Sequence, residues 1–569
     1  MQALKRFWRS LFDVRPGEYA KTALMSLYLM LVLFAYYILK PVSRALFLNN
    51  FDIDKLPWLY VLIAGIGGVL TYFYTKMALR TSLSKAVTIA NVFCVGVLCL
   101  FWWLITLGMG WVIYAFNIWV SLFSIMLVSQ GWLVAANVFT SREAKRLYGI
   151  LGVGSVIGAA FGGQFTAVMV YYVGTRNLVL ASAGMVVLSY IAYRMAIKAS
   201  GKTLEAAKGA EEEEEFSIGE IFGHIRRLRH LQVIVGIIII TFIVDVLVEF
   251  QFSAFAKQAY KGRDLTAFLG NFYGFWLNLV TFVLQLFLTN FVVSRFGVGG
   301  TLQIMPVSIA AASLGSLLAP SLLSTAATRL TEASTRYSFN KTGTELLYLP
   351  LPLELRNRVK AFVDVFVDRF ARGLGGMILV LFTTATAMQP QQFSIVVLVL
   401  AVLWIFLSII AQREYVATVR KRLELRRLDI ESSRITVSDR ATIQLLERTA
   451  REGSGRQAAY ALELLSQAPG YRLDALAAEL VRSPHPEVRG KAYEVARRSN
   501  NRALIDAALA EIRNARDPRD PGAVRDAVLY AIAESDEPAA LARRLFEHVH
   551  PQVPPAALSR AVGTRNGEP

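Results

Sequence analysis

Charged residues are scarce in this chain of 569 residues. Asp, Glu, Lys and Arg make up 18% of it, against about a quarter of an average soluble protein. Hydrophobic residues make up 55%. Apolar stretches such as residues 23–39 and 393–411 are long enough to cross, as helices, a hydrocarbon layer about 30 Å thick. The composition therefore excludes an ordinary soluble protein and predicts an all-α, polytopic membrane protein.

The residues of common catalytic and metal sites are also scarce. The two cysteines, Cys94 and Cys99, lie in one apolar stretch, which argues against a disulfide framework or a zinc site. The five histidines are scattered through linkers and the C-terminal tail, and neither a G-x-x-x-x-G-K-[ST] phosphate loop nor an H-E-x-x-H motif is present. We therefore expect no enzyme, no catalytic residue, no metal site, no cofactor and no ATP hydrolysis in this chain.

Positive charge is in excess, with a formal net charge of +18. The basic residues cluster at both ends and between apolar segments, where the positive-inside rule explains them without a nucleic-acid partner. The loops expected in the cytoplasm carry Lys76, Arg80 and Lys85; Arg142, Lys145 and Arg146; Arg226, Arg227 and Arg229; and Arg356, Arg358 and Lys360. This pattern predicts cytoplasmic N- and C-termini, and the basic N-terminus reads as a lead-in rather than a signal peptide.

Hydropathy predicts about twelve spans. They lie near residues 22–40, 58–77, 86–107, 111–136, 147–172, 177–197, 231–256, 267–291, 299–320, 323–349, 359–386 and 392–412. The predicted domains are a first six-helix half (1–197), an acidic cytoplasmic linker (198–230), a second six-helix half (231–412), a basic linker helix (413–436) and a cytoplasmic domain (437–569). Two such halves resemble the major facilitator architecture, in which the substrate site lies between them. The run "EEEEE" at 211–215 is typical of a solvated linker, with a metal or partner role as the alternative.

The C-terminal domain contains three similar segments. Residues 455–465, 488–498 and 524–534 each open a helix with an arginine, namely Arg456, Arg489 and Arg525. A recurrence of about 35 residues is typical of an α-solenoid. We expect HEAT-like repeats that bind a cytoplasmic protein partner; a small helical bundle is the alternative.

Ionisable residues recur inside the predicted spans. Each costs at least about 2.5 kcal/mol at the bilayer centre, so such residues usually face a cavity or a partner. They are Lys40 and Arg44 in the first span; Asp245, Glu249 and Lys257 in the seventh; and Arg329, Glu332, Arg336, Lys341 and Glu345 in the tenth, while the fourth carries the polar Asn117, Ser121 and Ser124. We expect these four spans to line a water-filled cavity.

The eleventh span carries a stripe of charges at intervals of four: Lys360, Asp364, Asp368 and Arg372. This spacing allows Lys360 to pair with Asp364 and Asp368 with Arg372 along one helix. The stripe then closes the cytoplasmic side as a structural element, or it takes part in gating.

Two spans are rich in glycine. The fifth has Gly154, Gly158 and Gly162 at intervals of four, and the second has Gly65, Gly67 and Gly68. Small residues on one face let helices approach closely. A dinucleotide-binding loop is the alternative, but the G-x-G-x-x-G spacing and a preceding strand are lacking.

Several stretches resemble the ATP/ADP translocase family of bacterial and plastid nucleotide transporters. They are Arg336-Tyr337-Ser338, Thr344-Glu345 and Tyr348-Leu349-Pro350-Leu351 in the tenth span; "EAKRLYGILG" at 143–152; "LVE" at 247–249 with Lys257 and "AFLGNF" at 267–272; and "KAFVDVF" at 360–366 with Gly375-Gly376. The resemblance covers residues 20–410. It implies a major facilitator-like transporter in a bacterial inner membrane, with nucleotide exchange as its activity.

The chain departs from the family pattern at four charged positions. The first-span lysine falls near Ser43, beside Arg44, and the fourth-span glutamate aligns with Asn117. Thr344 stands for the lysine of the family's K-E pair, and Gly373 for the lysine of its G-K-S-G-G motif. These departures concern the nucleotide rather than the fold.

Our leading hypothesis is a secondary transporter for a small or amphiphilic anion, working by alternating access. The predicted substrate-binding residues are Lys40, Arg44, Asn117, Arg336, Lys341 and Glu345. The predicted coupling and gating residues are Asp245, Glu249, Lys257, Asp364, Asp368 and Arg372. The alternatives are a membrane sensor or scaffold that no longer transports, and a carrier of lipids or lysolipids.

Overall fold

The computed structural model of the chain is helical, and its described residues contain no strand. The structure describes residues 14–15, 18–79, 83–200, 218–386, 388–424, 440–466, 468, 471–499, 501–513, 521–535, 537 and 540–541. The acidic run 211–215, Arg80 and residues 425–436 of the predicted basic linker helix lie outside these residues.

The described helices are grouped in chain order under the predicted domains, whose boundaries remain a prediction. The first half contains α2 (Tyr19–Asn50), η1 (Ile53–Lys55), α3 (Leu56–Leu79), α4 (Leu83–Ile105), α5 (Gly110–Val138) and α6 (Ser141–Ser200). The second half contains α7 (Ile218–Arg227), α8 (Arg229–Ala259), α9 (Gly262–Gly270), η2 (Asn271–Trp276), α10 (Leu277–Val283), η3 (Leu284–Leu288), α11 (Thr289–Leu318), α12 (Leu322–Thr335), η4 (Arg336–Asn340), α13 (Lys341–Tyr348), α14 (Leu353–Phe362), η5 (Val363–Val367), α15 (Asp368–Ala385), η6 (Pro390–Gln392) and α16 (Phe393–Glu424). The C-terminal part contains α17 (Arg440–Glu452), α18 (Gly455–Ser466), α19 (Asp474–Leu480), α20 (Pro486–Arg498), η7 (Arg502–Leu504), α21 (Ile505–Arg513) and α22 (Pro521–Glu534).

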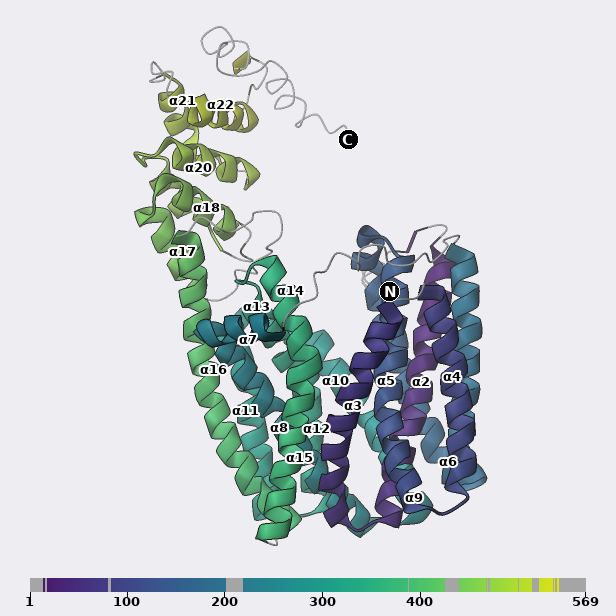
Figure 1. Ribbon diagram of the computed structural model, residues 1–569. Coiled ribbons are helices and arrows are strands. Elements are labelled where there is room, and N and C mark those ends of the chain that lie inside the picture. The colour runs from purple at the N-terminus through teal and green to yellow at the C-terminus, as the bar shows by residue number, and fades with distance from the viewer. Residues whose placement is uncertain are drawn as a thin grey trace. The chain divides into compact units, whose positions relative to one another are not determined.

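The chain forms two compact units. The first consists of Met1–Asn290, Thr301–Glu345 and Glu354–Ala411, and the second of Phe291–Gly300, Leu346–Leu353 and Gln412–Pro569. Within the first unit, the helices of the two halves form two groups, and α3 and α15 lie side by side between them (Figure 1).

Seven helices in the described part of the chain are long and apolar enough to cross a membrane. Two of these segments, Arg146–Ser200 and Gly262–Leu318, have 55 and 57 residues, which is too long for one crossing. Each contains a glycine with positive φ, Gly174 (81°) in the first and Gly297 (66°) in the second, where the helix bends. Each therefore matches two predicted spans. The total of twelve spans remains a prediction.

The glycine face of the fifth span packs against the first helix, as predicted. A Cβ added to Gly158 of α6 would lie 2.1 Å from the carbonyl oxygen of Met30 in α2, and one on Gly162 would lie 2.5 Å from that of Phe34. Such contacts let two backbones approach in a bilayer, where packing rather than the hydrophobic effect holds helices together. The close approach predicted for the second span is wrong at two positions: a Cβ on Gly65 or Gly68 of α3 would have no described heavy atom within 4 Å.

The C-terminal helices of the second unit pack in sequence. Helix α17 contacts α18, α18 contacts α20, and α20 contacts α22. Two of the recurring arginines pair with glutamates further along the chain: Arg456 Nε lies 3.3 Å from Glu487 Oε1, and Arg489 Nη2 lies 3.0 Å from Glu511 Oε1. The third recurring arginine pairs with its neighbour in sequence, Asp526. The HEAT-like character of these helices remains a prediction.

Candidate functional site

A polar cavity of about 310 Å³ lies between the two halves of the first unit. Helices α2, α3 and α5 of the first half line it, together with α8, η2, α12, η4 and α15 of the second. Its charged lining consists of Lys40, Arg44, Arg329, Arg336, Arg369 and Arg372 as cations, and Asp245, Glu249 and Asp368 as anions. The four spans expected at the cavity do line it, and so do parts of the second, eighth and eleventh.

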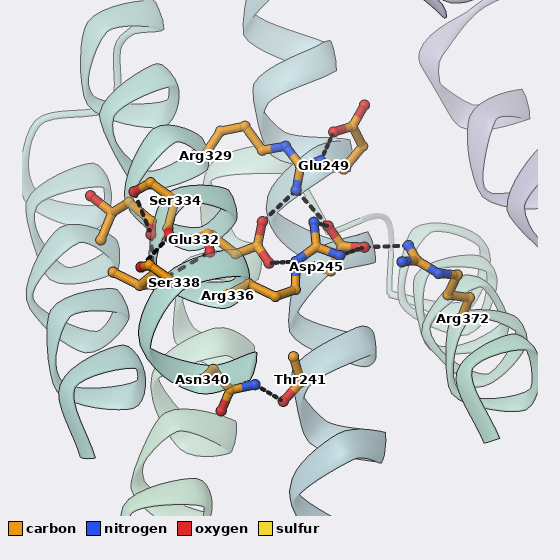
Figure 2. A network of polar contacts seen from close by, with 12 residues as sticks. Thr241, Asp245, Glu249, Arg329, Glu332, Ser334, Arg336, Ser338, Asn340 and Arg372 are labelled. Carbon is orange, nitrogen blue, oxygen red and sulfur yellow. Dashed lines mark hydrogen bonds and ion pairs between the residues drawn. The ribbon is translucent and has the colours of Figure 1, made fainter. Parts of the chain in front are cut away.

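Asp245 of α8 is the centre of a buried ionic network (Figure 2). Its carboxylate lies 2.6 Å from Arg329 Nη1 and 3.1 Å from Arg336 Nη2, and it also pairs with Arg372 of α15. Because Asp245 is only 2% exposed, its charge depends on these guanidinium groups instead of water.

Glu249 lies one turn further along α8 and joins the two halves. Arg329 Nη2 lies 2.6 Å from its Oε2, and the Tyr273 hydroxyl donates a hydrogen bond of 2.5 Å to its Oε1. Arg44 of α2 approaches the same Oε1 to 3.4 Å. The pair of Arg44 and Glu249 is therefore an ionic contact between the first and second halves.

Glu332 lies behind the cavity surface and is fully buried. Its carboxylate is 2.6 Å from Arg329 Nη1 and 3.0 Å from Arg336 Nε. Arg329 and Glu332 of α12 and Arg336, the first residue of η4, lie on one helical face because they are spaced by three and four positions. Glu332 thus holds the two arginines in place without contacting the cavity.

The local sequence explains how the tenth span presents these arginines. Helix α12 begins at a capping box formed by Ser321 and Ser324, and it changes at Arg336 to the π-helical turn η4. Ser338 in η4 donates a hydrogen bond of 2.6 Å to the Ser334 carbonyl, and Asn340 lies 3.4 Å from the Thr241 hydroxyl of α8 (Figure 2). Isolated π-turns inside helices are frequent at functional sites.

Asn117 of α5 connects two helices of the first half. Its side-chain nitrogen donates a hydrogen bond of 3.1 Å to the Ser43 carbonyl of α2 and another of 2.9 Å to the Ile113 carbonyl of α5. Ser43 follows Pro41, which lies inside α2. The Asn117 amide therefore fixes α2 next to the positions of Lys40 and Arg44.

Eight of the predicted site residues line the cavity: Lys40, Arg44, Asn117, Asp245, Glu249, Arg336, Asp368 and Arg372. Lys341, Glu345 and Asp364 lie outside it, in a half-exposed cluster. In that cluster Lys341 is 3.2 Å from Glu345, Lys360 is 2.8 Å from Glu345, and Asp364 is 4.0 Å from Lys341. Lys341 is five positions beyond Arg336 and follows the π-turn η4, in the part of the tenth span that does not line the cavity.

The stripe of the eleventh span is only partly paired within its own helix. Arg372 Nε lies 2.8 Å from Asp368 Oδ1, as predicted. Lys360 pairs with Glu345 instead of Asp364, so that half of the prediction is wrong. The reason is the π-helical segment η5, which contains Asp364 and interrupts the i,i+4 spacing.

Lys257 lies outside the cavity, at the end of the bundle that we call the α9 end (residues 49–52, 171–175 and 257–266). Its ammonium group donates a hydrogen bond of 2.5 Å to the Phe51 carbonyl and lies 3.7 Å from the Asp52 carboxylate. Asn49 and Gly262 exchange two hydrogen bonds, and Tyr171 donates to Asp264. Both halves contribute to each of these contacts, so the α9 end is joined across the halves.

Arg369 and Tyr273 are among the cavity-lining residues that the sequence did not single out. Arg369 is one position away from the regular stripe, and Tyr273 lies among aromatic residues that look like lipid-facing ones. No spacing rule indicated either residue, because a π-turn precedes Arg369 and another contains Tyr273.

Comparison with known proteins identifies similar sequences and folds. The family model described as TLC ATP/ADP transporter matches residues 96–319 and 319–415. ADP,ATP carrier protein 1 of Chlamydia trachomatis serovar D is 23% identical over 295 residues, which cover 45% of this chain and 55% of that protein. ADP,ATP carrier protein 3 of Rickettsia conorii is 24% identical over 368 residues, covering 56% and 73%. The match thus spans just over half the length of the chlamydial relative.

Two solved transporter structures share the fold. A crystal structure of the nucleoside transporter NupG has a TM-score of 0.51 at 12% identity, covering 68% of this chain and 99% of that one. A POT family transporter in complex with 5-aminolevulinic acid also has a TM-score of 0.51, at 10% identity, covering 70% and 96%. At this identity, the likeness concerns the fold alone.

Proposed function

The chain belongs to the TLC ATP/ADP transporter family, and from this premise we propose that it carries an anionic solute across the membrane by alternating access. Nucleotides of the ADP and ATP type are the first candidates, because the similar proteins are named ADP,ATP carriers. The observation that supports an anion is the cavity, whose lining holds six cations and three carboxylates.

The cavity offers donors to such an anion. Arg336 and Arg372 lie on the second half and Arg44 on the first, and a guanidinium group can hold a phosphate or carboxylate through two hydrogen bonds. The Nη1 atom of Arg44 and the hydroxyl of Tyr60 are buried without a hydrogen-bond partner in the described part of the chain. Both residues line the cavity, so a bound anion would satisfy them.

Alternating access requires that the halves separate at one end and meet at the other. We propose that the α9 end is the non-cytoplasmic end and that it is closed in this structure. The hydrogen bonds of Lys257, Asn49 and Tyr171 across the halves support closure there. Twelve spans, cytoplasmic termini and a bacterial inner-membrane location belong to the same proposal.

The C-terminal helices α17 to α22 are proposed as a cytoplasmic, HEAT-like domain that binds a protein partner. Exposed large hydrophobic side chains occur between Tyr19 and Phe406, and none occurs in the described residues of these helices. Their surface is thus suited to water, whereas that of the membrane part is suited to lipid.

Exchange of labelled solute tests the proposal. Purified protein in liposomes loaded with ADP should take up labelled ATP or ADP, and Arg336→Ala should reduce uptake at least about tenfold, the effect of losing about 1.4 kcal/mol of binding. If no nucleotide or other anion is exchanged, the transport proposal fails. A phenotype that depends only on residues 437–569 would then favour the scaffold, and exchange of lysolipid alone would favour the lipid carrier.

A further inference from the structure

Two cations of the cavity lack a carboxylate partner within the described part of the chain, and they come from opposite halves. Arg44, Arg329, Arg336 and Arg372 each lie within 4.0 Å of a carboxylate oxygen. Lys40 of α2 and Arg369 of α15 do not, although both line the cavity.

The surroundings of Lys40 are aromatic. Its ammonium nitrogen lies 4.5 Å from the centre of the Tyr273 ring and 5.7 Å from that of the Tyr37 ring. Cation–π contacts of this kind attract a cation, but they do not neutralise it. A positive charge therefore remains in the cavity beside α2.

Arg369 reaches across from the second half toward the first. Its Nη1 atom lies 3.5 Å from the Ser121 hydroxyl of α5, which is a neutral and weak acceptor at that distance. Most of its hydrogen-bond donors stay available, because a guanidinium group carries five N–H bonds.

The charge balance of the site points to the same two residues. The six cations face four carboxylates when the buried Glu332 is included, so two positive charges are left over. Buried charges are normally paired, and a ligand can supply the missing partners.

We infer that the substrate carries at least two negative charges, and that Lys40 and Arg369 are the residues that select for them. This inference rests on the proposed transport function. A solute that binds both residues contacts α2 and α15 at once and thereby links the two halves. A singly charged analogue would leave one of the two cations without a partner, and a neutral analogue would leave both without one.

Binding measurements with the full chain in lipid nanodiscs test the inference, with ADP, AMP and adenosine as probes. The affinity of the wild type should increase with the number of phosphates. Lys40→Gln and Arg369→Gln should each weaken ADP binding about 10- to 100-fold, as expected for the loss of a charge-assisted hydrogen bond. Both variants should reduce the preference for ADP and AMP over adenosine, because the phosphate of AMP already carries up to about two negative charges.

Variants that keep the charge separate recognition from folding. Lys40→Arg and Arg369→Lys should retain most of the ADP affinity, and Arg194→Gln, which removes an exposed cation of α6, should bind as the wild type does. If the wild type binds ADP and both glutamine variants bind it equally well, the inference is overturned and the transport proposal stands. If the wild type binds none of the probes and exchanges no anion, the proposed function itself is overturned.

Discussion

Gly376 of α15 lies directly against Val61 of α3, since a Cβ added to Gly376 would come within 2.9 Å of Val61 Cγ2. One turn earlier in α15, a Cβ on Gly373 would lie 3.2 Å from Ala64 Cβ. Further along α3, a Cβ on Gly68 would have no described heavy atom within 4 Å. The two helices are thus tightly packed at one end of their contact and apart at the other, as expected for halves that rock against each other.

Leucine at Gly68 should therefore slow transport without unfolding the protein. A Cβ at this position meets no described heavy atom within 4 Å, and replacing a helical glycine removes a cost of up to about 1 kcal/mol. It would obstruct α15 when the halves close at that end. We expect an unchanged or higher melting temperature together with a clear loss of exchange rate. Gly96→Leu in α4 is the control, because its site is equally open and lies away from α15; full activity of Gly68→Leu would contradict this closure.

Replacing Asp245 by Asn should destabilise the protein strongly. Three guanidinium groups would lose their shared carboxylate, and breaking a buried ion pair by removing one partner costs about 3–5 kcal/mol. Asp364→Asn is the matched comparison. The Asp364 side chain is 55% exposed, so its ion pair with Lys341 should contribute at most about 1 kcal/mol to the free energy of unfolding. Unfolding in denaturant measures both effects. Equal stability of the two variants would show that the network does not hold the second half together.

Arg44 and Glu249 should be energetically coupled across the halves. A double-mutant cycle with Arg44→Gln and Glu249→Gln should give an interaction energy of about 1–3 kcal/mol, because the pair is partly buried. The exposed pair of Arg448 and Glu452 should give less than about 0.5 kcal/mol in the same assay. Additive effects of the two cavity mutations would mean that the 3.4 Å contact does not join the halves.

Lys257→Met should open the α9 end. The hydrogen bond to the Phe51 carbonyl would be lost, whereas the pair with Asp52 contributes little because that carboxylate is 94% exposed. We expect faster maleimide labelling of a cysteine placed at the buried Ser253, in a background with Cys99→Ser. With Asp52→Asn in place of Lys257→Met, the same cysteine should be labelled as fast as it is in the protein that keeps both Asp52 and Lys257. Identical labelling of all three proteins would exclude Lys257 from closure.

Glu143, at the start of α6 and outside the candidate span that begins at Arg146, should give a pH-dependent contribution to stability. A hydrogen bond of 2.6 Å from Lys21, aided by the Thr140 backbone, lowers the pKa of Glu143 from about 4.5 to about 2. A carboxyl group with a lowered pKa stabilises the fold above its unfolded pKa and loses this effect as the pH falls through the folded one. The melting temperature of the wild type should thus exceed that of Glu143→Gln at pH 6, and the difference should shrink between pH 4.5 and 2. A constant difference would contradict the pKa shift.

Much of the fold follows from the sequence because hydropathy and glycine spacing act locally. Seven described helices are long and apolar enough to cross a membrane, and the face of Gly154, Gly158 and Gly162 packs against α2. The positions of Asp245 and Glu249 at the cavity follow from four-residue spacing within the regular helix α8. The same rule failed for Lys360, which pairs with Glu345 instead of Asp364, because the π-turn η5 changes the phase of the helix and leaves no mark in a hydrophobic pattern.

The sequence by itself determined that this protein is helical, spans a membrane and places costly charges within its spans, since each property depends on residues close together in the chain. Only the tertiary structure decided which charges meet. The three arginines around Asp245 and the contact of Arg44 with Glu249 join helices far apart in sequence. That Lys40 and Arg369 have no carboxylate partner among the described residues also depends on how these helices pack. Ion pairing depends on distances of a few ångströms between side chains, and only the packing of the two halves sets those distances.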